Sequence, residues 1–342
     1  MANKILEVQN LKKYFPIEKG FLKREVGNIK AVDDISFNLF EGETLGLVGE
    51  SGCGKTTAGR AILRLIEPTD GSVKYYKTDS NNSKDDESVL IENLTKKQLR
   101  SLKQEMQIIF QDPYSSLNPR ISIGGMIEEP IKFHALLKKS LIKEEVAHLL
   151  TDVGIDKEYY GRYPHEFSGG QRQRIGIARA LSLKPRLIVA DEPVSALDVS
   201  VQAQILNLLR RLQRKYKLTY LFISHDLSVI KYISDRIAVM YLGKIIEIGN
   251  TDQIFTSPKH PYTEAILSAV PIPFPNSNEN QIVLSGDVPS AANPPKGCYF
   301  HTRCKYVKDI CRNEYPQNTE INETHSVNCH FAKTLNLKNN RF

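Results

Sequence analysis

Apolar residues alternate with polar residues in two stretches near the N-terminus, at residues 5–8 and 29–40, which is the pattern of half-buried strands. The basic and aromatic stretch at residues 11–16 is predicted to end the first strand. The apolar run at residues 44–48 predicts a buried strand, and the helical spacing after it predicts a helix over residues 55–66. The sequence thus predicts two half-buried strands, followed by a buried strand, a loop and a helix.

The middle of the chain changes character. Residues 77–87 are polar with almost no apolar anchors, and we expect an exposed loop there. A short buried strand is predicted at residues 106–110, followed by helical spacing at residues 123–137 and 141–153. We therefore expect a helical insertion at about residues 112–165.

From residue 168 onward helices and strands alternate regularly. The predicted order is helix 168–183, strand 187–190, helix 199–217, strand 220–223 and helix 227–233. Such alternation predicts an α/β fold with a parallel sheet covered on both faces.

The end of the chain departs from this alternation. Residues 236–241 and 244–248 predict a hairpin, and further helices are expected after residue 249 and at His260. The proline-rich residues 271–275 predict a semi-rigid linker to a tail that contains four cysteines.

Composition fits an ordinary globular protein. The chain has 342 residues, of which 41% are hydrophobic and 25% charged, and no apolar run is long enough to span a membrane. Its N-terminus lacks a hydrophobic signal segment, so we expect a protein that is neither secreted nor membrane-spanning. The formal charge of +7 permits a nucleic-acid or anionic-membrane partner, but the basic residues are scattered among acids, which favours a solvated surface.

Residues 49–57 fit the phosphate-loop pattern of a glycine, four free positions and Gly-Lys-Ser/Thr, between a predicted strand and a predicted helix. Small residues let backbone N–H groups close around phosphate oxygens at the positive end of the helix. Lys55 would contact the β- and γ-phosphates, and Thr56 would offer a hydroxyl to Mg²⁺. The predicted ATP-binding residues here are Gly49, Glu50, Ser51, Gly52, Cys53, Gly54, Lys55, Thr56 and Thr57. Cys53 is most simply a small residue that fills the loop.

A second acidic element follows the apolar run 187–190, where Asp191 and Glu192 end a predicted strand. Open α/β sheets bind ligands at the carboxyl ends of their strands. Asp191 is placed to contact Mg²⁺, and Glu192 is a candidate for polarising an attacking water. The alternative is that the two acids only cap the next turn.

Two glycines stand at the start of the helix predicted after Ser168. Glycine is ordinarily enriched after a helix, so Gly169 and Gly170 suggest a close approach by another group. Ser168 can cap the helix while the glycine amides face an anion. From the residues alone, a flexible helix start is an equal alternative.

Residues 167–171, in their order between the phosphate loop and the acidic strand end, resemble the signature motif of ATP-binding-cassette (ABC) ATPases. The resemblance covers about residues 5–250. It implies a P-loop fold with a RecA-like α/β core, an antiparallel β subdomain and the helical insertion.

The resemblance also assigns roles to residues. Tyr14 would stack on adenine, Gln111 would link Mg²⁺ and the attacking water to the transmembrane partner, and His225 would contact the γ-phosphate. Asp198 would lie at the seam of a head-to-tail dimer, in which ATP lies between one chain's phosphate loop and the other chain's signature. The residues that complete that site in trans would be Ser168, Gly169, Gly170 and Gln171.

Residues 110–120, 162–167 and 258–263 are similar to the oligopeptide/dipeptide branch of ABC importers. Within that branch, residues 111–120 are more similar to the F-type ATPase than to its D-type sibling. This implies an ATPase domain at residues 1–255 with an extension at residues 256–342. It also implies two membrane permeases, an extracytoplasmic solute-binding protein and a second, non-identical ATPase, with this chain peripheral at the cytoplasmic face of the membrane.

The four tail cysteines are Cys298, Cys304, Cys311 and Cys329, and their spacing differs from that of common zinc ribbons. In a reducing cytosol such a cluster suggests a metal before disulfides. The family resemblance favours a four-cysteine [4Fe-4S] centre. Zn²⁺, with or without histidine ligands such as His301, and a tail of free thiols are the alternatives.

These observations lead to an ATP-hydrolysing subunit of a peptide importer. Nickel, metallophores and other small solutes remain possible cargo, because the ATPase does not touch the solute. A soluble cassette ATPase acting on nucleic acid or ribosomes is a second class, although neither a second cassette nor a long coiled-coil insertion is present, and we expect no nucleic acid. An iron–sulfur redox protein with a nucleotide switch is a third.

Overall fold

The computed structural model describes residues 3–20, 24–77, 88–112, 114, 116–270 and 282–337. The chain forms two compact units, each assembled from separate stretches of sequence. Unit 1 consists of Met1–Ile5, Leu39–Thr44 and Asn93–Ile223, and unit 2 consists of Leu6–Asn38, Leu45–Glu92 and Ser224–Phe342. The functional division at residue 255 stays a prediction.

Unit 1 contains a parallel sheet made of β6 (Met106–Ile109), β7 (Leu187–Asp191) and β8 (Thr219–Ser224), with β7 in the centre. Leu187 lies opposite Met106 on one side and Thr219 on the other. Every residue of β7 and β8 is buried, as expected for parallel strands covered on both faces. The predicted α/β fold is confirmed in this unit.

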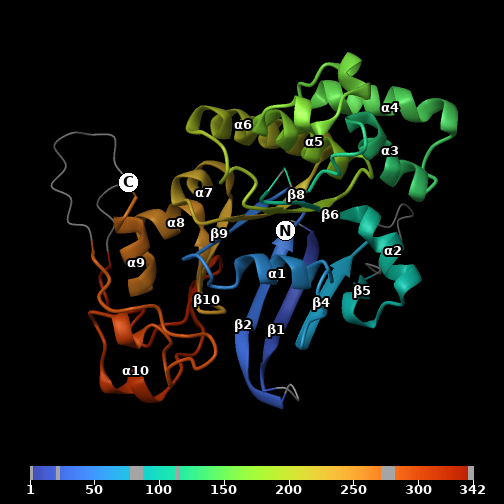
Figure 1. Cartoon of the computed structure of the whole chain (residues 1–342). Helices are drawn as coiled ribbons and strands as arrows, with labels where there is room; N and C mark the ends of the chain where they lie inside the picture. The colour runs from blue at the N-terminus through green and yellow to red at the C-terminus, as the bar shows by residue number, and fades with distance from the viewer. Residues whose placement is uncertain are drawn as a thin grey trace. The chain divides into compact units, whose positions relative to one another are not determined.

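Helices make up most of the remainder of unit 1. They are α2 (Lys96–Glu105), α3 (Ile123–Phe133), α4 (Lys139–Asp152), α5 (Gly169–Leu181) and α6 (Val199–Tyr216). Helices α3 to α6 gather in the green and yellow part of the chain in Figure 1. Their apolar faces supply buried residues such as Ile127, Leu150 and Leu209. The helices predicted in this part of the chain are confirmed, and α2 is an additional helix.

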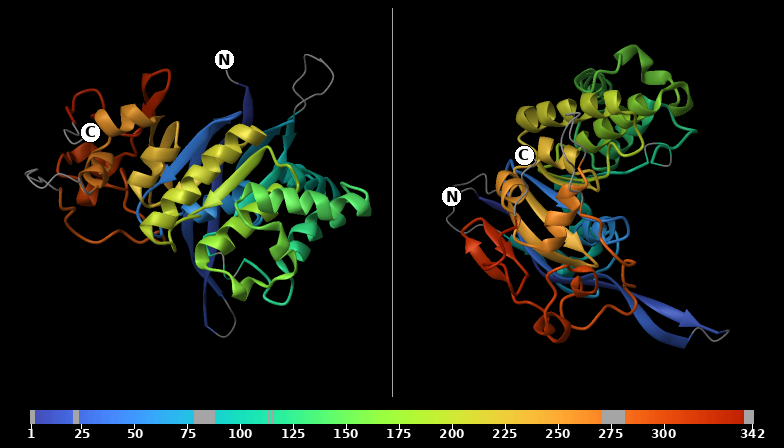
Figure 2. Two further views of the ribbon diagram at one scale, coloured as in Figure 1. Left: turned by 90° about the horizontal axis from the view of Figure 1, so that it is seen from above. Right: turned by 90° about the vertical axis from the view of Figure 1, so that its left-hand side faces the viewer.

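Unit 2 contains an antiparallel sheet of β1 (Lys4–Lys19), β2 (Arg24–Phe40), β4 (Asp70–Tyr76) and β5 (Ser88–Leu90), in the order β2-β1-β4-β5. The long β1 and β2 strands lie side by side (Figures 1 and 2). The prediction that β1 ends at residues 11–16 was wrong. The β1–β4 register ends at Lys12 opposite Asp70, and β1 continues to Lys19, where the sequence pattern no longer alternates.

The other sheet strands of unit 2 follow the order β11-β12-β10-β9-β3. Their bounds are β3 (Thr44–Val48), β9 (Arg236–Tyr241), β10 (Lys244–Asn250), β11 (Thr319–Asn322) and β12 (His325–Val327). β3 and β9 are parallel, and β9 and β10 form the predicted hairpin, with positive φ angles of 45° at Leu242 and 82° at Gly243. Strand β12 pairs with β10 and thereby joins the C-terminal extension to this sheet.

The helices of unit 2 are α1 (Lys55–Ile62), α7 (Leu227–Ile233), α8 (Thr251–Thr256), α9 (Pro261–Ser268) and α10 (Asp309–Asn313). Helix α7 has the predicted bounds. Helix α1 ends earlier than predicted, and Arg64 beyond it has a φ of 48°. The predicted loop after residue 77 and the predicted proline-rich linker lie outside the described residues.

Candidate nucleotide site

The phosphate loop occupies the turn between β3 and α1, as predicted. Gly54 precedes the helix with a φ of 106°, and a Cβ atom there would lie 1.9 Å from the carbonyl oxygen of Ala31. Only glycine fits this position. As the N-cap, Gly54 provides no side chain to the first-turn amides of α1, and that turn carries no acidic residue. The helix start is therefore suited to an anion.

Lys55 folds back over the loop. Its side chain is buried, and Nζ donates hydrogen bonds to the carbonyl oxygens of Gly49 at 2.8 Å and Glu50 at 3.1 Å. Cys53 is buried beside it, and burial raises the pKa of its thiol. A protonated, enclosed thiol fits the predicted role of a small filler residue.

Glu50 is held at two points by residues from the C-terminal part of the chain. Its N–H donates to the Tyr262 hydroxyl at 2.9 Å, and its carboxylate accepts two hydrogen bonds from the Arg303 guanidinium, at 2.9 and 3.2 Å. The sequence predicts Glu50 as a residue of the loop, but neither of these two partners is evident from it. No spacing signal connects residues 253 positions apart.

Tyr14 belongs to the same unit as the phosphate loop. Its hydroxyl donates to the Asp33 carboxylate, which also accepts a hydrogen bond from Tyr299 at 2.7 Å and lies 3.3 Å from Lys244 Nζ. Burial acts to raise the pKa of Asp33, but the hydrogen bonds from Tyr14 and Tyr299 and the nearby lysine charges together lower that pKa. Asp33, Tyr299 and Lys244 are thus residues around Tyr14 that the sequence did not reveal.

The acidic residues lie at the end of β7, in unit 1. Asp191 is buried, and the Glu192 side chain accepts a hydrogen bond from Gln111 Nε2 at 3.1 Å. Glu192 has a φ of 47°, a conformation that is costly for a non-glycine residue and is concentrated at functional sites. The structure therefore brings together two of the predicted catalytic residues, Gln111 and Glu192.

The predicted signature residues form a capping box at the start of α5. Ser168 Oγ accepts from the Gln171 N–H at 3.4 Å, and Gln171 Oε1 accepts from the Ser168 N–H at 3.0 Å. Gly169 is exposed, whereas a Cβ on Gly170 would lie 2.5 Å from Val201 Cγ1 of α6. The sequence predicted that another group approaches these glycines closely. At Gly170 that group is Val201 of the same chain.

Asp198 and His225 are both exposed. Asp198 caps α6 by accepting from the Val201 N–H at 3.0 Å and the Ser200 hydroxyl at 2.7 Å. His225 follows β8 and precedes the α7 cap Asp226. His225 belongs to the unit that contains the phosphate loop, whereas Gln111, Asp191 and Glu192 belong to the other unit.

All four tail cysteines line one small cavity of about 20 Å³, together with His260 and Phe300 among others. Burial raises the pKa of Cys298 to about 12 and that of Cys329 to about 11, so both are protonated thiols in this arrangement. Within the described part of the chain, no three His, Cys, Asp or Glu side chains are arranged to hold a metal ion. The cysteines therefore gather as predicted, but without metal-ligand geometry.

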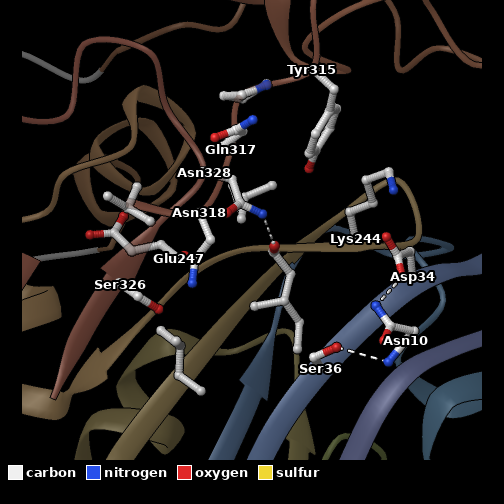
Figure 3. A pocket seen from close by; sticks show the side chains of 15 residues that line it. Asn10, Asp34, Ser36, Lys244, Glu247, Tyr315, Gln317, Asn318, Ser326 and Asn328 are labelled. Carbon is white, nitrogen blue, oxygen red and sulfur yellow. Dashed lines mark hydrogen bonds between the residues drawn. The ribbon is translucent and has the colours of Figure 1, made fainter. Parts of the chain in front are cut away.

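A larger polar cavity of about 330 Å³ lies elsewhere in unit 2 (Figure 3). Its walls come from β1, β2, β10 and residues 315–328, and it includes none of the predicted site residues. Several of its polar groups bond to one another, for example the Asn10 side chain to Asp34 at 2.9 Å and Asn328 to the carbonyl of Ile245 at 3.0 Å.

A helix long and apolar enough to cross a membrane does not occur among the described residues. Two family models match the chain: "ABC transporter" at residues 32–195 and "Oligopeptide/dipeptide transporter, C-terminal region" at residues 246–311.

Curated relatives match nearly the whole chain. The oligopeptide transport ATP-binding protein AppF of Bacillus subtilis is 52% identical, with 95% of this chain and 97% of that protein covered. The oligopeptide transport ATP-binding protein OppF of Escherichia coli is 47% identical, with 95% of each covered. A solved dimer of the ATP-binding cassette MJ0796, bound to ADP and Pi in a post-hydrolysis state, is similar with a TM-score of 0.60 and 25% identity. That match covers 72% of this chain and 99% of that chain.

Proposed function

The chain belongs to the ABC transporter ATPases with the oligopeptide/dipeptide transporter C-terminal region, and from this premise we propose that it is the ATP-hydrolysing subunit of a peptide importer. It binds ATP with Mg²⁺ and works with membrane permease subunits. The main support for this proposal is the 52% identity of the chain, over almost its full length, to an oligopeptide transport ATP-binding protein. The signature and catalytic residues discussed above support the same function.

The proposed roles follow from the chemistry of each group. Lys55 neutralises the phosphates, and the Thr56 hydroxyl, the Gln111 amide and the Asp191 carboxylate supply the hard oxygen donors that Mg²⁺ prefers. When bound, Mg²⁺ supplies charge neutralisation to the phosphates. Glu192, oriented by Gln111, accepts the proton of the attacking water, and His225 contacts the γ-phosphate.

We propose that the chain functions as half of a head-to-tail dimer. Its phosphate loop and Tyr14 hold one ATP, while Ser168, Gly169, Gly170 and Gln171 complete the site on its partner, with Asp198 at the seam. ATP then holds the pair closed, and hydrolysis releases it, which transmits motion to the permeases. The resemblance to F-type subunits favours a non-identical partner ATPase.

The experiment that tests this chemistry is Glu192→Gln in the assembled transporter. Loss of the general base should lower steady ATP turnover by roughly 10²-fold or more while leaving ATP binding intact. Glu144→Gln, an exposed glutamate on α4, is the matched control. Unchanged turnover in Glu192→Gln would exclude the assigned base.

The relatives' names support a proposal for the cargo, and the family resemblance supports one for the location. We propose that the cargo is a peptide, with nickel, a metallophore or another small solute as the alternative, and that the chain is peripheral at the cytoplasmic face. Residues 1–255 would form the ATPase domain and residues 256–342 the importer-specific extension. Co-purification with permeases and a solute-binding protein is expected, whereas co-purification with RNA or ribosomes would favour the soluble class.

For the four tail cysteines we propose a [4Fe-4S] centre, with Zn²⁺ as the alternative. Four cysteine sulfurs suit either group once they lose their protons on binding it, and their convergence on one cavity supports a shared ligand. The cavity as it stands holds about one water molecule, so a cluster requires outward movement of the side chains. Anaerobic purification with metal analysis and visible absorption decides between iron, zinc and free thiols.

A further inference from the structure

A carboxylate in a phosphate-binding loop is an electrostatic liability. Glu50 stands in the loop between Gly49 and Ser51, where an incoming polyphosphate brings several negative charges. Two like charges repel strongly at short range where water is scarce. A basic partner for Glu50 would reduce this repulsion and hold its carboxylate in a fixed direction.

Arg303 is this partner. Its side chain is only 8% exposed, and it forms a two-pronged ion pair with Glu50, with Nη1–Oε2 at 2.9 Å and Nη2–Oε1 at 3.2 Å. Paired hydrogen bonds of this kind fix direction as well as charge. The backbone of Glu50 is held as well, because its N–H donates a hydrogen bond to the Tyr262 hydroxyl. Both the main chain and the side chain of Glu50 are therefore fixed.

The groups that hold Glu50 are themselves rigidly packed. Phe300, three residues before Arg303, is buried, and its ring centroid lies 5.4 Å from that of Tyr262 and 5.3 Å from that of Tyr241. Arg303 ends the short 3₁₀ helix His301–Arg303 that follows. The aromatic contacts therefore position both the hydroxyl and the guanidinium before any ligand arrives.

Glu50 is also hydrogen-bonded to Lys55, the lysine of the phosphate loop. Lys55 Nζ donates to the Glu50 carbonyl oxygen, so a shift of Glu50 moves the acceptor that orients the ammonium. We propose that Arg303 is a positioning residue for the phosphate loop, through which the C-terminal extension sets nucleotide affinity. This inference rests on the proposed function, since it requires the loop to bind ATP.

The test measures binding of a fluorescent ATP analogue with Mg²⁺ to the full-length chain. Arg303→Met leaves the Glu50 carboxylate unpaired in the loop and should weaken binding roughly tenfold or more, and Arg303→Lys should lie between it and wild type. Glu50→Gln combined with Arg303→Met should bind more tightly than Arg303→Met alone, because the unpaired charge is gone.

Lys305→Met is the matched control. Lys305 lies two residues further along and pairs with Glu264 at 3.2 Å instead of with the loop, so its loss should leave affinity unchanged. If Arg303→Met does not fold, the comparison of Arg303→Lys with Arg303→Lys plus Glu50→Gln replaces it.

Three results would overturn the inference: wild-type affinity in folded Arg303→Met, a double variant no tighter than the single one, or an equal loss in Lys305→Met. Lys55→Ala separates this outcome from the proposed function. Retained ATP binding in Lys55→Ala would contradict nucleotide binding by the loop itself, whatever Arg303 does.

Discussion

Asp33 is a buried carboxylate that joins three separate parts of unit 2. Tyr14 of β1 and Tyr299 of the extension both donate to it, and Lys244 at the start of β10 lies at ion-pair distance. Lys244 also lies over the rings of Tyr299 and Tyr315, at 5.4 and 4.7 Å from their centroids. The orientation of Tyr14 therefore depends on residues far from it in sequence.

This arrangement predicts a specific acid dependence of stability. Because the pKa of Asp33 is lowered in the folded chain, the unfolded chain takes up a proton first as the pH falls. The stabilisation is fully present above the ordinary pKa of 3.8 and is lost as the pH falls through the lower folded value. Urea unfolding from pH 6 to pH 3 should therefore show a shallower acid loss for Asp33→Asn than for wild type.

At pH 6, Asp33→Asn should also be less stable by about 1–3 kcal/mol, because hydrogen bonds to a charged acceptor are replaced by weaker ones. Asp252→Asn on the exposed side of α8 is the control and should keep the wild-type acid profile. Parallel acid limbs for wild type and Asp33→Asn would contradict the role of this carboxylate.

At the scale of elements, α5 and α6 are packed through Gly170. Val201 of α6 occupies the space where a side chain at residue 170 would begin. A Cβ atom added to Gly169 would instead lie 3.5 Å from Leu197 Cδ2, which is an ordinary contact distance. The absence of a side chain at residue 169 and at residue 170 therefore has two different explanations. Packing within the chain explains Gly170, while Gly169 is left for the proposed contact with the partner's nucleotide.

Alanine substitutions separate the two reasons. Gly170→Ala should destabilise the chain by about 1–3 kcal/mol through overpacking, and Val201→Ala should restore most of that loss. Gly169→Ala should change the unfolding free energy by less than about 1 kcal/mol, yet lower ATP turnover in the assembled transporter. Urea unfolding and a steady-state ATPase assay measure the two effects. Normal turnover in Gly169→Ala would count against a trans contact there.

Elements with strong local signals were predictable from the sequence. The apolar runs of β7 and β8 and the spacing of α7 identify them because each buries a continuous or periodic apolar face. Helix α2 was missed because it has a single buried residue, Leu102. Its capping box of Thr95 and Gln98 was a usable signal.

Only the part of the candidate site that follows local sequence patterns was predictable. Glycines, Lys55 and the Asp191–Glu192 pair follow local spacing rules that chemistry imposes. The hydrogen bond from Gln111 to Glu192, the φ of 47° at Glu192 and the partners of Glu50 arise from tertiary packing. No local pattern encodes such contacts, so the residues were found but their surroundings were not.

At the scale of the molecule, Glu247 joins residues of the C-terminal extension to strand β10 within unit 2. This buried carboxylate of β10 accepts hydrogen bonds from the N–H groups of Lys259 and His260, at 2.6 and 2.9 Å, and lies 2.8 Å from Nε2 of His325 on β12. The start of α9 and the last strand of the extension thus share one acceptor. Its removal should loosen both.

Glu247→Ala should lower the unfolding free energy by roughly 3 kcal/mol or more, because several buried donors lose their acceptor together. Glu320→Ala, an exposed residue of β11, should change stability by no more than about 0.5 kcal/mol. Urea unfolding at neutral pH provides the comparison. Similar losses in the two variants would mean that Glu247 does not anchor the extension.

The Glu50–Arg303 pair also has a consequence for the order in which the protein is made. The ribosome synthesises the phosphate loop 253 residues before the arginine that neutralises it. At about 5–20 residues per second, that interval is roughly 13–50 seconds. If Arg303 positions the loop as proposed, the nascent loop lacks that partner throughout this interval and would bind cellular ATP weakly. Full affinity would then arrive only with the folded extension, so that unfinished chains would neither capture nucleotide nor compete for the permeases.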